Sequence, residues 1–318
     1  MGLSNIMKFF SFLSSKEKLS LGIQLDKNFA RIAVLEKEGD EFVLPIMPFE
    51  IELPEDAEQA GLIIRDELDK REIKVKNAVV SIPIGSTLYK TLKLPKFSSQ
   101  ELEEAVEWNI KEDIKSLKGS TVYDYDIISE EDDVYNILVV IAKIDEIEEA
   151  KDILYYAGIT PDIMDSEGIA LINIANLQKE KDPALKEEAN LCILHLDYND
   201  SYLVFFHNNV FVQTLNFDAK RYEEVNPNEK EKIVDKLIKE INYFFLTISE
   251  PKSIFTSGLF VKFPEIQAYM QLKFSTRFSL VELDPVKALN LDYEGRIPLS
   301  LYAVPFGLAY RRFENDKD

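Results

Sequence analysis

The chain has 318 residues, with 37 Lys and Arg against 57 Asp and Glu, so its formal net charge is −20. This length predicts about two domains, and a hydrophobic content of 46% excludes wholesale disorder. The negative charge repels phosphate backbones, which argues against nucleic acid as a partner. One Cys and two His exclude an internal disulfide, disfavour a zinc site and fit a reducing cytoplasm.

Residues 1–17 are expected to form a separate N-terminal amphipathic segment. Its apolar run, residues 6–13, is too short for a spanning helix and lacks the cleavage site of a signal peptide. Such a segment either rests on a bilayer or docks on the rest of the fold. The side chains that would contact lipid are Phe9, Phe10, Phe12 and Leu13.

The pattern of residues 18–82 predicts a hairpin meander, a crossover helix and a strand buried on both faces. This order of elements is typical of a mixed α/β sheet. A tight turn at 26–28 separates the first two strands. The expected strands are 19–25, 30–35, 41–51 and 77–82, and the expected helix is 55–71.

Residues 83–162 have a different order of strands and helices and are expected to form an inserted α+β subdomain. Ser98 and Glu101 make a capping box that begins a helix, and Gly158 suits the C-cap of another. The expected elements are strands at 88–94, 123–128 and 134–142, a helix that begins at Ser98 or Ser99, and a helix at 144–157.

The chain is then expected to return to the first sheet through 160–164 and a helix at 166–177. The first half therefore comprises 18–82 and 163–188, and its charged, proline-containing end at 179–188 is a candidate hinge.

The second half, 189–318, repeats the opening of the first. Leu25, Asp26 and Asn28 recur 171 residues later as Leu196, Asp197 and Asn199, with the same strand–turn–strand order around them. This repeat indicates an internal duplication. The expected strands are 191–196, 201–206, 210–217 and 253–255, and the expected helices are 228–248, 264–272 and 298–312, the last interrupted at Pro305.

Two related halves with an insertion in the first resemble the actin-like (ribonuclease H-like) ATPase fold. The chain is similar to the PilM branch of the FtsA/PilM family, with the cytoplasmic part of GspL as a cousin. The residues that carry the likeness are Val80-Ser81-Ile82-Pro83, Leu92-Lys93-Leu94-Pro95, Glu103-Glu104-Ala105-Val106-Glu107-Trp108 and Tyr155-Tyr156-Ala157-Gly158-Ile159-Thr160-Pro161. The second half is reduced, because only about 25 residues separate Phe217 from Tyr243, where relatives insert a small subdomain.

The resemblance also locates a nucleotide cleft, whose residues depart from the family pattern. At the first turn the metal-organising Asp is Gln24 and the following Gly is Asp26. At the second turn the same positions hold His195 and Asp197. A side chain in place of Gly blocks close backbone approach, and a carboxylate there repels phosphate. The adenosine-binding loop, Ser-Gly-Gly-Gly in relatives, keeps only one glycine, Gly258.

We therefore predict a pseudo-ATPase that takes neither ATP nor magnesium and holds no metal. The vestigial cleft would consist of Gln24, Asp26, Asn28, Arg31, His195, Asp197, Asn199 and Gly258. Apart from the family pattern, the sequence contains no Walker loop, GxGxxG, GxSxG elbow or His-rich metal spacing.

Several of these residues have a second interpretation. His195 is expected to be hydrogen-bonded at the end of a buried strand, the alternative being a catalytic or ligand role. Asp26 and Asp197 either cap their turns or face one another and hold a cation. Arg31 is expected on a strand surface, and Cys192 in the core.

The resemblance implies a cytoplasmic protein at the inner face of the inner membrane. It would bind the short N-terminal cytoplasmic tail of a bitopic PilN-like protein. We predict a scaffold of a type IV pilus or related type II secretion machine, which would also contact other platform proteins and self-associate weakly. The alternatives are an active ATP-binding ATPase or switch and a filament-forming, cell-division-type protein. The tail would lie between the first large subdomain and the insertion, on Leu94, Leu102, Val106, Trp108 and Ile110, although Trp108 also suits the core.

Overall fold

The computed structural model describes residues 19–188, 190–207 and 210–314. The expected membrane contacts Phe9, Phe10, Phe12 and Leu13 lie outside the described residues.

The first half is built on a mixed sheet of order β3-β2-β1-β5-β9, with β4 also paired to β2. The single strand expected at 41–51 is two short strands, because Pro45 and Pro48 lack the N–H that a continuous ladder requires. The strands are β1 (Leu19–Leu25), β2 (Phe29–Glu38), β3 (Glu41–Val43), β4 (Phe49–Glu52), β5 (Asn77–Ile82) and β9 (Thr160–Ser166), and the crossover helix is α2 (Ala57–Lys70).

The second half repeats this topology in a sheet of order β12-β11-β10-β13-β14. In both sheets the first strand pairs antiparallel with the second and parallel with the strand after the crossover. β1 ends at Leu25 and β10 at Leu196, which are the first residues of the repeated motif. The predicted duplication is therefore confirmed. The strands are β10 (Leu191–Leu196), β11 (Ser201–Phe206), β12 (Val210–Leu215), β13 (Ser253–Gly258) and β14 (Ser279–Glu282).

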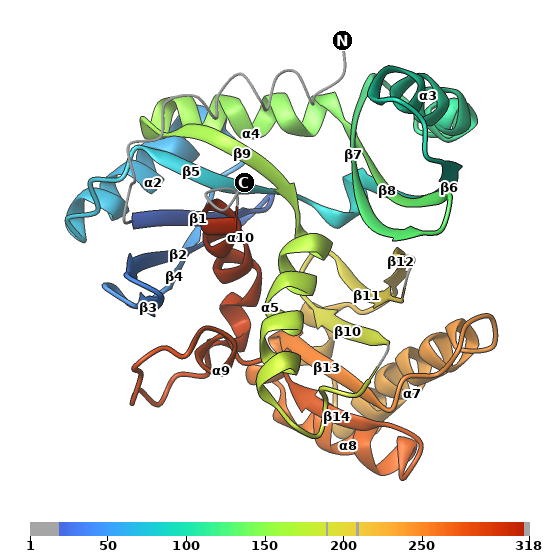
Figure 1. Ribbon diagram of the computed structural model, residues 1–318. Helices are drawn as coiled ribbons and strands as arrows, with labels where there is room; N and C mark the ends of the chain where they lie inside the picture. Colours follow the sequence, from blue (N-terminus) through green and yellow to red (C-terminus); the bar gives the residue numbers. More distant parts are fainter. Residues whose placement is uncertain (1–18, 189, 208–209, 315–318) are drawn as a thin grey trace.

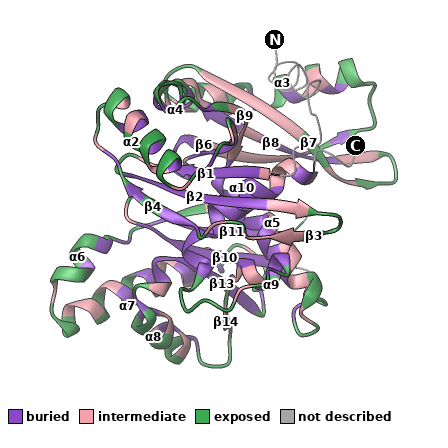
Figure 2. Cartoon of the chain, turned by 90° about the vertical axis from the view of Figure 1, so that its left-hand side faces the viewer, coloured by how far each residue is buried: buried purple, intermediate pink, exposed green. Residues whose placement is uncertain are grey.

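Two helices join the halves at the centre of the molecule, α5 (Glu167–Lys181) and α10 (Ala303–Glu314). Although α10 ends the second half, it packs on β1, β2 and β5 of the first sheet. A Cβ on Gly22 of β1 would lie 2.0 Å from the carbonyl oxygen of Pro305, so glycine permits this close approach. Pro305 lies in the first turn of α10, where no intrahelical N–H is needed, and does not interrupt the helix. Figure 2 shows both helices buried between the sheets.

The inserted subdomain is a three-stranded sheet, β6-β8-β7, covered by α3 (Ser99–Ser116). The predicted capping box is confirmed, since the Glu101 carboxylate accepts from the Ser98 backbone N–H at 3.1 Å. Helix α4 (Ile144–Ala157) instead packs on α2 through Ile153 and Leu154. The insertion therefore ends near residue 143 and not at 162. Its strands are β6 (Thr87–Pro95), β7 (Thr121–Glu131) and β8 (Val134–Lys143).

The remaining elements of the second half are helices and 3-10 turns around its sheet. Between β12 and the long helix α7 lies only α6, which agrees with a reduced second half. The expected hinge is in part the end of α5, which continues to Lys181. These helices are α6 (Ala219–Glu224), α7 (Pro227–Phe244), α8 (Pro264–Phe274) and α9 (Pro285–Leu289), with 3-10 turns η3 (Leu259–Val261) and η4 (Leu299–Tyr302). A further 3-10 turn, η2 (Ile84–Ser86), connects β5 to β6.

Candidate functional site

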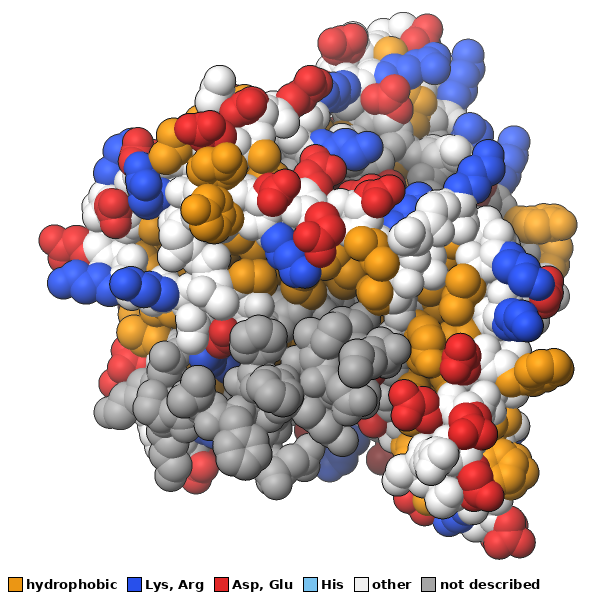
Figure 3. All heavy atoms as spheres, turned by 90° about the horizontal axis from the view of Figure 1, so that it is seen from above, with side chains coloured by type: hydrophobic (Ala, Val, Ile, Leu, Met, Phe, Trp, Pro, Cys, Tyr) orange, Lys and Arg blue, Asp and Glu red, His pale blue; other side chains and the backbone are white. Residues whose placement is uncertain are grey.

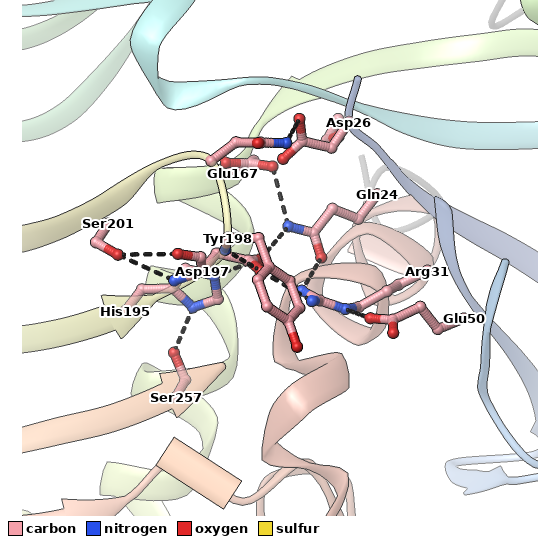
Figure 4. A network of polar contacts seen from close by, with 12 residues as sticks. Gln24, Asp26, Arg31, Glu50, Glu167, His195, Asp197, Tyr198, Ser201 and Ser257 are labelled. Atoms are coloured by element: carbon pink, nitrogen blue, oxygen red, sulfur yellow. Dashed lines mark hydrogen bonds and ion pairs between the residues drawn. The ribbon is translucent and has the colours of Figure 1, made fainter. Parts of the chain in front are cut away.

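A network of polar side chains lies where the two sheets face each other (Figure 4). Gln24 of β1 and Arg31 of β2 come from the first half, and Asp197, directly after β10, comes from the second. Glu167 is the first residue of α5, which links the halves. All four side chains are buried, so the cleft between the halves is filled by the protein's own polar groups.

Arg31 is at the centre of this network. Its guanidinium donates two hydrogen bonds to the Asp197 carboxylate, from Nη2 at 2.9 Å and from Nη1 at 2.5 Å. Its Nε donates to Glu50 at 2.6 Å, and its Cζ lies 4.3 Å from the centroid of the Phe29 ring. The expectation of a surface arginine was wrong. Arg31 is 0% exposed, because the second half covers this side of the β1–β2 hairpin.

The ion pair decides the charge of Asp197. Burial alone would raise the pKa of this carboxyl, but the adjacent Arg31 guanidinium and the His195 ring hold the pKa well below its usual range. The two carboxylates around Arg31 raise its pKa despite its burial. Both groups are therefore charged at neutral pH.

His195 is a buried, hydrogen-bonded residue at the end of its strand, as expected. Its Nδ1 lies 2.8 Å from Ser257 Oγ, and its Nε2 lies 3.4 Å from the Asp197 carboxylate. The backbone N–H of Asp197 donates to Ser201 Oγ at 3.1 Å, which fixes the turn after β10. Both ring nitrogens of His195 thus have partners within the protein.

Glu167 was not singled out by the sequence, where an acidic residue at a helix start is unremarkable. It accepts hydrogen bonds from Gln24 Nε2 at 3.1 Å and from the Tyr202 hydroxyl at 3.4 Å. Burial raises its pKa to about 8, and the nearby charges of Asp26 and Asp197 act in the same direction. A protonated Glu167 at neutral pH keeps the centre of the cleft from holding another negative charge.

The repeated turn residues meet at the edge of the cleft. Asp26 accepts from the backbone N–H of Lys27 at 2.6 Å, and Asn199 Nδ2 from the other half donates to the same oxygen at 2.7 Å. Asp26 therefore caps its turn, and Asp197 is paired with Arg31. The two carboxylates do not face each other across a shared cation site. Asn28 is exposed, and its backbone carbonyl accepts from Leu53.

Gly258 is needed for packing within the second half. Its φ of 76° is in the left-handed region, and a Cβ would lie 2.2 Å from the Leu196 carbonyl oxygen and 2.9 Å from the His195 ring. Backbone conformation and close packing therefore explain why glycine stands at this position of the expected adenosine loop.

The residues expected to line a partner groove do not form one surface. Leu94, Leu102, Val106 and Ile110 are buried in the core of the inserted subdomain, between α3 and its sheet. Only Trp108 is accessible, with 75% of its surface exposed, so the interpretation of Trp108 as core was wrong as well.

Trp108 lies on the outer side of α3, beside a shallow hollow of about 460 Å³ shared with Glu104, Glu107, Lys111, Ile114 and Lys115. The Lys111 ammonium is 5.6 Å from the Trp108 ring centroid. On the face seen from above, side chains of both charges and hydrophobic side chains are interspersed (Figure 3).

Among the described residues, no helix is long and apolar enough to cross a membrane. In the same residues, no group of three or more His, Cys, Asp or Glu is placed to hold a metal ion.

Comparisons with known proteins agree with this architecture. Residues 47–224 match the family described as type IV pilus assembly protein PilM. The chain is similar to the solved PilM–PilN type IV pilus biogenesis complex, with 17% identity, 92% of this chain and 98% of that chain covered, and a TM-score of 0.74. It is also similar to the ethanolamine utilization protein EutJ of Carboxydothermus hydrogenoformans, with 9% identity, 96% of both chains covered and a TM-score of 0.54.

A weaker likeness links the chain to the cytoplasmic domain of EpsL, an inner-membrane component of the type II secretion system of Vibrio cholerae. The identity is 10%, the coverage is 75% of this chain and 81% of that chain, and the TM-score is 0.44. No curated protein matches the chain. Because the PilM match spans more than half of the residues, the chain belongs to the PilM family of type IV pilus assembly proteins, and its fold is actin-like.

Proposed function

We propose that this chain is a non-catalytic scaffold of type IV pilus assembly, or of a related secretion machine. It would bind the N-terminal cytoplasmic tail of a bitopic inner-membrane protein similar to PilN. Membership of the PilM family supports the pilus role. The partner is suggested by the solved PilM–PilN complex, to which the chain is similar over nearly all of its length. Such a scaffold would lie in the cytoplasm, at the inner face of the inner membrane.

The observation that carries the non-catalytic part is the buried pair of Arg31 and Asp197. A polyphosphate entering the cleft would have to displace Asp197 from its guanidinium, or lie against that carboxylate and Asp26. Two like charges about 4 Å apart repel by about 4 kcal/mol near a protein surface. Arg31 offers no compensation, because Asp197 and Glu50 already neutralise it. We therefore propose that neither ATP nor magnesium binds.

Two other functions make different predictions. An active ATPase or switch requires nucleotide affinity near the micromolar range, which the acidic cleft disfavours. A filament-forming protein would give polymers visible by negative-stain microscopy. Weak self-association and contacts with other platform proteins stay compatible with the scaffold.

The exposed Trp108 lies on the outer side of α3 and not where the insertion meets the first large subdomain, so we propose that the tail contacts the inserted subdomain along α3, with Trp108 as an anchor. Exposed aromatic side chains are frequent energetic centres of interfaces. The other four residues expected there are buried, and they would act only by holding α3 in place.

The experiment is a calorimetric titration with synthetic N-terminal tails of membrane proteins encoded beside this chain. One tail is expected to bind saturably. Trp108→Ala should weaken that binding at least tenfold, whereas Tyr243→Ala should leave it unchanged. Tyr243 is a matched control, since it is 74% exposed but lies on α7 of the second half. Absence of binding by every tail would overturn the adaptor function, and equal effects of the two variants would remove Trp108 from the site.

A further inference from the structure

We propose that Arg31 is an internal clamp that holds the two halves of the molecule closed without any ligand. The proposal concerns motion between the halves and goes beyond the proposed function, because it does not depend on the identity of the partner. It rests on contacts that cross from one half to the other at the cleft.

Several polar contacts cross between the halves, but among the ion pairs that do so in the described residues only Arg31–Asp197 is buried on both sides. Arg31 binds Asp197 with two hydrogen bonds, and both side chains are almost completely buried. Nearer the edge, Asn199 donates to Asp26 at 2.7 Å. The Lys262 ammonium lies 3.4 Å from Glu50, and both of these side chains are partly exposed to water. The central contact is therefore the one that water competes with least.

The internal duplication explains why Arg31 points into the cleft. In the first hairpin Gln24 lies opposite Arg31, and in the second hairpin His195 lies opposite Tyr202. Each pair occupies the same place in its repeat, and all four side chains reach the same network. The first half supplies the cation and Asp197 of the second half supplies the anion, so only the two halves together complete the pair.

Because of this geometry, the free energy rises steeply when the two halves move away from their closed arrangement. A displacement of about an ångström between the halves breaks the paired hydrogen bonds while both charges are still shielded from water. The charges would then be unpaired and poorly hydrated, which is the costly condition for buried ions. His195, which belongs to the same half as Asp197, lies 3.4 Å from its carboxylate and reduces its freedom to follow Arg31. Gln24 of the first half adds a second contact of 3.4 Å to Asp197 across the cleft.

Distance measurements between spin labels on the two halves test the clamp. Asp66→Cys on α2 and Lys239→Cys on α7 place labels on exposed residues of different halves. The native Cys192 is fully buried and does not compete for the label. We expect one narrow distance distribution for the otherwise unchanged protein and at least a doubling of its width in Arg31→Met. Lys262→Ala, which removes an edge contact, should leave the width unchanged.

A second variant keeps the test valid if Arg31→Met does not fold. Arg31→Met combined with Asp197→Leu leaves no unpaired charge in the pair and should fold, again with a widened distribution. Unchanged widths in these variants, or equal widening by Lys262→Ala, would overturn the clamp. Addition of ATP and magnesium to the labelled protein is a separate arm. A shift there would overturn the proposed lack of nucleotide binding, whereas the clamp is decided by the Arg31 variants alone.

Discussion

Replacing Arg31 by Met should destabilise the protein strongly. The variant keeps Asp197 buried beside His195 and Glu167 but removes the guanidinium that stabilises its charge. Breaking a buried ion pair by removal of one partner costs about 3–5 kcal/mol of unfolding free energy. For a chain of this size that corresponds to a fall in Tm of roughly 4–8 °C. Urea denaturation followed by circular dichroism, together with thermal melts, measures both quantities.

The matched control for this substitution is Arg277→Met. Arg277 also binds a carboxylate, Glu250, with two hydrogen bonds and lies over an aromatic ring, but 38% of its side chain is exposed. Its loss should cost at most about 1 kcal/mol, because water screens the pair. Arg31→Met with Asp197→Leu should recover most of the lost stability. A cost for Arg31→Met no larger than that of Arg277→Met, or no recovery in the double variant, would refute the reasoning.

Three further predictions concern other residues of the site and the core. The folded protein holds a proton on Glu167, whose pKa is about 8 against about 4.5 for a free carboxyl, so wild-type stability should fall as the pH rises through this window. The unfolding free energy of Glu167→Gln minus that of wild type, measured by urea denaturation, should therefore rise by a few kcal/mol from about pH 5 to about pH 8.5. A difference that does not change with pH would contradict the raised pKa. Gly258→Ala should cost clearly more than Gly39→Ala in the same assay, because both positions have positive φ but only the Cβ at Gly258 meets other atoms. Ile110→Ala should cost about 2–5 kcal/mol and Trp108→Ala at most about 0.5 kcal/mol, and the reverse order in thermal melts would show that α3 presents the other face.

The architecture could be predicted because its signals are local or repeated. Alternation, the capping box at Ser98 and the glycine cap at Gly158 lie within single elements. The duplication could be found because Leu25-Asp26 and Leu196-Asp197 end equivalent strands. The misplaced end of the insertion has a simple cause, since α4 follows β8 directly but its apolar side faces α2.

The network in the cleft could not be predicted in the same way. Arg31 on a strand next to a turn has the pattern of a surface residue, and its partner Asp197 is 166 positions away in the other half. The direction of Glu167 likewise depends on how α5 sits between the sheets. The exposure of Trp108, in contrast, could have been predicted from the sequence. Leu102, Val106 and Ile110 recur every four residues, which places Trp108 on the opposite side of α3.

We propose that the cleft of this PilM-family protein is closed by its own charges and binds no nucleotide. Isothermal titration of the full chain with ATP in the presence of magnesium tests it most directly. We expect no saturable binding up to about millimolar ATP. A saturable isotherm with a Kd near the micromolar range would contradict it.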